Sequence, residues 1–81
     1  MIVILHNFRG FKYLINTNNI NSVSFTVVDS KQYADEIAEA GGSPLTRIYI
    51  DWYGGSSTSI LAISEVADEF LNLFENTIEI F

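Results

Sequence analysis

His6 is the single histidine of this 81-residue chain, and it follows an apolar run at residues 1–5. A metal site built from several imidazoles therefore cannot form within one chain. As a general base, His6 would need a nucleophile or an orienting carboxylate within hydrogen-bond reach, and its sequence neighbours supply neither. We interpret it as a residue at a strand end whose ring is satisfied by backbone or water.

The serines and the glycine pairs lack the surroundings that catalysis or phosphate binding requires. Gly55-Ser56-Ser57 has no glycine after the serine, which a nucleophile elbow needs. Gly41-Gly42 and Gly54-Gly55 have no following lysine and open no helix after a strand, so they do not resemble phosphate loops. The sequence therefore predicts no serine nucleophile and no phosphate site.

The neighbouring carboxylates, such as Asp35 with Glu36 and Asp68 with Glu69, fall on predicted helix surfaces. Charged residues at such positions normally face water. They also lack the alternating oxygen ligands around a glycine that form a calcium loop. We predict no catalytic residue, no metal site and no cofactor.

The charge of the chain is negative and unevenly distributed. Ten acidic residues against four basic ones give a formal net charge of −6, and all the basic residues precede residue 48. Negative charge repels phosphates, which disfavours nucleic acid and anionic membranes as partners. The alternative is a local basic patch of Arg9, Lys12 and Arg47 that binds nucleic acid.

The length and the absence of cysteine limit how the chain is stabilised. A chain of this size holds one hydrophobic core, so we expect a single domain over residues 1–81. Without cysteine there are no disulfides and no thiolate metal sites, and small cores are marginally stable. Association of copies, most simply as a homodimer, is therefore expected. The apolar N-terminal run lacks a preceding basic region and no run is long enough to span a membrane, so we expect a cytoplasmic location.

Runs rich in β-branched and aromatic residues, most of them alternating with polar ones, predict five short strands. They cover residues 1–6, 11–15, 22–28, 45–53 and 58–63, with turns at Gly10 and Gly54-Gly55. Residues 31–40 have apolar side chains at helical spacing between the candidate N-caps Asp29 or Ser30 and the glycines that follow, which predicts a short helix. The alternative for this segment is a mobile polar insertion.

The clearest helix begins at Ser64, a good N-cap, and extends to about Asn76. Its apolar residues recur at helical spacing from Val66 to Phe74, which predicts one buried face. Residues 77–81 alternate again and form either a last short strand or a hydrophobic tail. We therefore predict an α+β fold: one antiparallel sheet of about five strands, in the order strand, strand, strand, helix, strand, strand, helix, covered by the C-terminal helix.

An aromatic cluster near residue 50 suggests a binding surface. If Trp52 points into the core, strand alternation places Arg47, Tyr49 and Tyr53 on the opposite sheet face. Tyrosine buries a large area with few rotatable bonds, so these three residues, with Phe81 in the C-terminal segment, are candidate interaction residues. The alternative is that the 31–40 helix covers this face and the tyrosines form a second layer of core.

A pattern of aliphatic residues, one glycine and an Ile-Asn pair extends through the first third of the chain. It consists of Ile2-Val3-Ile4-Leu5, Gly10, Tyr13-Leu14-Ile15-Asn16, Ile20 and Val23. This pattern resembles FlbD-like flagellar accessory proteins and compact bacterial PH-like sheets. The resemblance implies two or three strands around an Ile-Asn turn and a final amphipathic helix. Residues 29–47 depart from the pattern, so neither a motility role nor a functional residue carries over; the composition is also similar to that of small uncharacterised viral and phage proteins.

Together these features predict a non-enzymatic interaction or accessory protein that self-associates as a dimer through a sheet face or edge and binds a protein partner. Two alternatives remain. The first is an enzyme whose site is completed across subunits, with a contribution from His6 or the acidic pairs. The second is a nucleic-acid-binding accessory protein that uses the basic patch.

Overall fold

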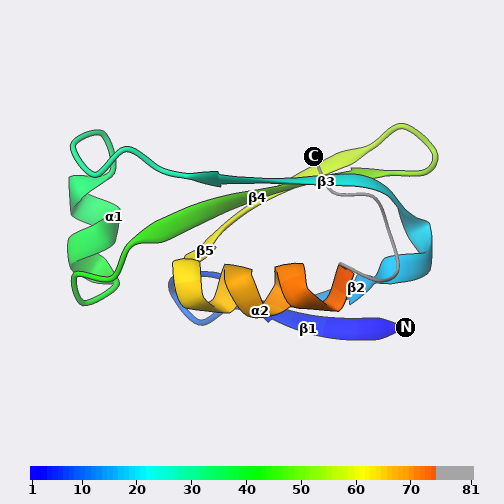
Figure 1. Cartoon of the computed structure of the whole chain (residues 1–81), viewed down its shortest axis with the longest axis horizontal. Helices are drawn as coiled ribbons and strands as arrows, with labels where there is room; N and C mark the ends of the chain where they lie inside the picture. The colour runs from blue at the N-terminus through cyan, green and yellow to red at the C-terminus, as the bar shows by residue number, and fades with distance from the viewer. Residues whose placement is uncertain (75–81) are drawn as a thin grey trace.

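The computed structural model describes residues 1–74, which form two layers with a short helix at one end (Figure 1). The elements in chain order are β1 (Ile2–His6), β2 (Lys12–Asn16), η1 (Thr17–Asn19), β3 (Ile20–Val27), α1 (Ala34–Glu39), β4 (Leu45–Trp52), β5 (Ser57–Ile63) and α2 (Ser64–Phe74). One layer is the antiparallel sheet β3-β4-β5. The other consists of the antiparallel hairpin β1-β2 and, beside it, α2. The α+β class and the element order are therefore confirmed.

The prediction of one sheet of about five strands is wrong, because the hairpin forms a sheet of its own. The division lies at η1, between β2 and β3. The side chain of Asn16 accepts a hydrogen bond from the Asn18 amide at 3.1 Å, and the Thr17 amide donates to the Met1 carbonyl at 2.9 Å. The first bond holds a tight turn and the second ties that turn to the start of β1, so the chain is redirected and the hairpin packs against the three-stranded sheet instead of extending it.

The hydrophobic core lies between the two layers. Its buried members come from every strand and from α2: Leu5, Ile15, Ile20, Val23, Ile48, Ile50, Ile60, Ala62, Ala67 and Phe70. The core residues of β4 and β5 alternate along the strand, as expected for strands with one buried face. In β3 they are three positions apart, because the ladder has a register irregularity between Ile20 and Ser22. Phe70 is 2% exposed, and its ring lies 6.2 Å from that of Phe25. The prediction that the C-terminal helix covers the sheet is therefore confirmed.

The short helix is confirmed, but it is α1 at Ala34–Glu39 and starts three residues later than predicted. Asp29 caps a turn instead of the helix: its carboxylate accepts from the Lys31 amide at 2.9 Å, and its carbonyl accepts from the Tyr33 amide at 3.0 Å. The helix N-cap is Tyr33, which makes no side-chain capping bond. No residue of α1 is buried, because the helix lies at one end of the molecule, beyond the two layers (Figure 1).

Two further expectations concern the end of the chain and the membrane. The predicted helix end at Asn76, the predicted strand at 77–81 and the candidate contact Phe81 lie outside the described residues. Within residues 1–74, no helix has the length and apolar character needed to cross a membrane.

Candidate interaction surface

The outer face of the hairpin carries exposed apolar side chains. In β1 and β2, alternate residues such as Leu5 and Ile15 point into the core, so their neighbours point outward. Three of these outward residues are large and aliphatic: Ile2 is 64% exposed, Ile4 54% and Leu14 73%. Ile4 lies directly opposite Leu14 in the ladder. We call this surface of Ile2, Ile4 and Leu14 the hairpin face.

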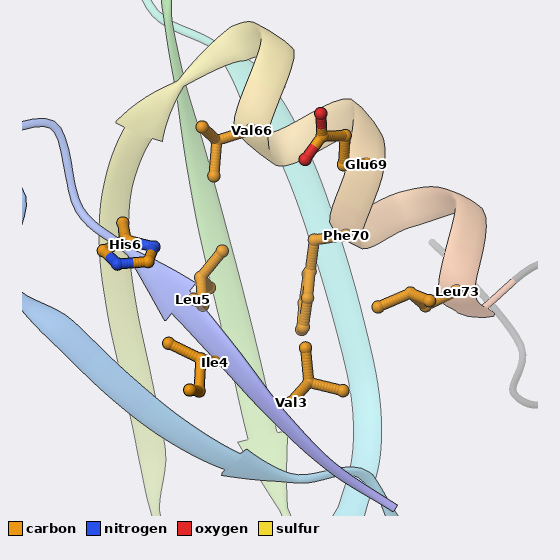
Figure 2. A pocket seen from close by; sticks show the side chains of 8 residues that line it. All are labelled: Val3, Ile4, Leu5, His6, Val66, Glu69, Phe70 and Leu73. Atoms are coloured by element: carbon orange, nitrogen blue, oxygen red, sulfur yellow. The ribbon is translucent and has the colours of Figure 1, made fainter.

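A groove lies next to the hairpin face, between β1 and α2, with a volume of about 280 Å³ (Figure 2). Its lining consists of Val3, Ile4, Leu5, His6, Val66, Glu69, Phe70 and Leu73. The α2 members recur at spacings of three and four, so they lie along one side of the helix. Phe70 points from α2 toward β1 and forms part of the inner wall. Because Ile4 belongs to both surfaces, the groove and the hairpin face are continuous.

The groove contains two ionisable groups, His6 on the β1 wall and Glu69 on the α2 wall. His6 is exposed at the end of β1, opposite Lys12, so water can satisfy its ring. The other six lining residues are aliphatic or aromatic, and none is a nucleophile. Among residues 1–74, no group of three or more His, Asp or Glu side chains could hold a metal ion. The lining therefore favours binding of apolar groups. Because His6 also borders this groove, an enzyme whose site is completed across subunits stays a prediction.

The predicted aromatic residues lie on a different surface. Tyr49 is 42% exposed on the open face of the three-stranded sheet, where its register neighbours are Ser24 and Ser59. Tyr53 is 68% exposed, but it follows the end of β4 and belongs to the turn before β5. Since α1 buries no residue and both tyrosines are exposed, the alternative in which a helix covers them as second-layer core is wrong. Their role as interaction residues stays a prediction.

Trp52 points toward the core side as expected. It is half-buried against the core, and its indole Nε1 donates to the Thr58 hydroxyl at 2.9 Å. The polar end of the ring is therefore satisfied inside the fold.

Two of the three basic residues that could bind nucleic acid, Arg9 and Arg47, interact with other side chains of the chain. Arg47 donates to the Tyr33 hydroxyl, and its guanidinium lies 5.4 Å from the centre of the Tyr33 ring. Arg9 donates to the Glu39 carboxylate at 3.0 Å. Lys12 lies at the start of β2, next to the hairpin face. The structure does not join the three cations into one free patch.

Sequence reasoning missed the hairpin face. The run at residues 1–5 is apolar at every position, which is typical of a strand buried on both faces. The available signal was that a chain this small provides too few elements to cover both faces of its first hairpin. No protein-family model, no curated protein and no solved structure matches the chain.

Proposed function

We propose that this chain is a non-enzymatic interaction module that forms a dimer and that uses the hairpin face to bind a different protein. The observation that carries the proposal is the exposure of Ile2, Ile4 and Leu14, each more than half accessible on one side of two paired strands. Contiguous apolar surface of this kind on a small domain marks a site of association.

The physical reason is the free energy of removing apolar surface from water, about 25 cal/mol for each Å² buried. The groove beside Ile4 adds concave apolar surface in which a partner's side chain would be enclosed, as at the centres of most interfaces. Because Glu69 borders the groove and the chain is acidic, we expect the partner to place a cation or a neutral group there. The cytoplasmic location expected from the sequence is part of the proposal.

Site-specific photo-cross-linking in the producing cell tests the binding surface. A photoreactive amino acid at Leu14 should yield an adduct with a second polypeptide, whereas the same residue at the exposed control position Gln32 should not. Adducts at Tyr49 or Tyr53 alone would transfer the site to the open sheet face. Equal yields at Leu14 and Gln32 would contradict the hairpin face.

Light scattering coupled to size-exclusion chromatography tests the dimer. At roughly 50 µM, the concentration range of weak biological dimers, we expect the mass of two chains, decreasing toward one on dilution. A mass of one chain at every concentration would remove the self-association claim.

A further inference from the structure

The longest unpaired sheet edge in the described part of the chain is β3. This eight-residue strand pairs with β4 on one side, and no strand within residues 1–74 pairs with its other side. It contains no charged residue, although exposed edges are usually protected by charges or proline. By contrast, the other edge of the sheet has a contact, since the Phe8 amide donates to the Leu61 carbonyl of β5 at 2.8 Å.

The direction of the β3 backbone groups follows from the ladder. The Val28 amide donates to the Leu45 carbonyl, and these two residues continue the β3–β4 register. In an antiparallel ladder, hydrogen-bonded pairs alternate with non-hydrogen-bonded pairs, so Thr26, Ser24 and Ser22 direct their backbone groups at β4. The backbone N–H and C=O groups of the residues between them, Val23, Phe25 and Val27, therefore point outward from the sheet.

The five residues of β3 from Val23 to Val27 form a chemical palindrome. On either side of Phe25 stand first a hydroxyl residue, Ser24 or Thr26, and then a valine, Val23 or Val27. An antiparallel pairing of two copies about a two-fold axis at Phe25 therefore places like beside like along the whole segment. We propose that two copies of this chain pair through their β3 edges and so form one continuous six-stranded sheet.

The proposed register satisfies the backbone and the side chains together. Each residue whose backbone groups point outward meets another such residue: Phe25 meets the partner's Phe25, and Val23 meets the partner's Val27. These are the pairs that exchange both backbone hydrogen bonds. Val27, which is 71% exposed in the single chain, would lie beside the partner's Val23 at the end of that subunit's core. The two Ser24–Thr26 contacts place hydroxyls opposite each other, and no like charges meet.

The occupant of this edge is a second copy because the edge complements itself without any charge to select a different strand. The pairing leaves the hairpin face free on both subunits, since that face belongs to the other layer (Figure 1). The β3 pairing rests on the proposed function only in requiring that a dimer exists. It adds the surface and the strand register of that dimer.

Lysine substitutions at two positions whose native side chains are similarly exposed test which surface forms the dimer. Val27→Lys places a charge on the proposed edge, and Leu14→Lys places the same charge on the hairpin face, where the native side chain is 73% exposed. Both native side chains are largely in water, so both variants should fold, which circular dichroism checks. By light scattering, Val27→Lys should raise the dimer dissociation constant at least about tenfold, and Leu14→Lys should leave it within about twofold.

The outcomes separate the two proposals. If the unsubstituted chain is a monomer, self-association fails and the edge pairing fails with it. If it is a dimer that Leu14→Lys dissociates as strongly as Val27→Lys, or that Val27→Lys does not dissociate, the edge pairing is overturned while self-association stands.

Engineered disulfides test the register, and the natural absence of cysteine makes them specific. Opposed residues in a non-hydrogen-bonded pair lie close enough for a disulfide. A mixture of Ser24→Cys chains and Thr26→Cys chains should therefore cross-link under mild oxidation more rapidly than either variant alone. Equal rates in the mixture and in the separate variants would contradict the two-fold axis at Phe25.

Discussion

Both faces of the β1-β2 hairpin carry large aliphatic side chains, but the two sets lie in opposite environments. The inner face contains Leu5 and Ile15, each 2% exposed and packed against the three-stranded sheet. The outer face contains Ile4 and Leu14, which are as apolar but mostly in water. Side-chain chemistry alone therefore does not decide burial in this hairpin.

What decides burial is the supply of covering elements. The sheet β3-β4-β5 and the helix α2 cover only one side of the hairpin, and α1 lies at the end of the molecule (Figure 1). A domain of this size has too few elements to build a third layer. The inner face therefore stabilises the fold, and the outer face is left available for association.

The largest effect expected from this comparison is on folding stability. Leu5→Ala should lower the free energy of unfolding by about 2–5 kcal/mol, because it removes a buried side chain and leaves a cavity. Ile4→Ala, one position along the same strand, should lower it by no more than about 1 kcal/mol, because most of the native side chain already contacts water. Urea denaturation followed by circular dichroism measures both values.

These measurements should be made in the Val27→Lys background, so that dissociation of a dimer does not contribute to the transition. Equal losses for Leu5→Ala and Ile4→Ala would mean that the outer face is covered in solution. The distinction between the two faces of the hairpin would then be lost.

A smaller effect is expected from the pair on the outer face. Ile4 and Leu14 are direct register partners at a non-hydrogen-bonded position, where side chains lie closest. A double-mutant cycle with Ile4→Ala and Leu14→Ala should give a coupling energy of roughly 0.2–1 kcal/mol. A pair in which Leu14→Ala is combined with the distant Tyr53→Ala provides the control and should show no coupling. A coupling well above this range would indicate that the pair is buried by a second molecule.

The local elements were predictable because each leaves a periodic pattern in the sequence. Val23, Ile48 and Ile60 sit at alternating positions of strands with one buried face, and Phe70 sits on the apolar side of a helix, so the pattern identified strands and helix together. The division into two sheets was not predictable in this way. It depends on the turn after Asn16, whose direction is set by hydrogen bonds to its own backbone and to Met1.

The candidate site was harder to predict than the fold. Tyr49 and Tyr53 are exposed, as the interaction-surface interpretation required. Strand alternation nevertheless placed Tyr53 on the sheet face, whereas it belongs to the turn after β4. The hairpin face escaped prediction because Ile2 and Ile4 have the same local pattern as buried strand residues. Exposure depends on which elements pack where, and no single segment of sequence encodes that.

The smallest effect is expected at the tip of the hairpin, where its exposed side contacts α1 through an ion pair. Arg9 and Glu39 are 3.0 Å apart, but their side chains are about half exposed, at 54% and 50%. Water and salt screen such a pair, so Glu39→Gln should change the free energy of unfolding by no more than about 0.5 kcal/mol, less than any apolar change on either face. Because no residue of α1 is buried, the same substitution should instead increase amide hydrogen exchange within Ala34–Glu39. If Glu39→Gln left amide exchange in α1 unchanged and lowered stability as much as Leu5→Ala, the ion pair would support the core. An exposed contact would then matter as much as a buried side chain, contrary to the comparison of the two hairpin faces.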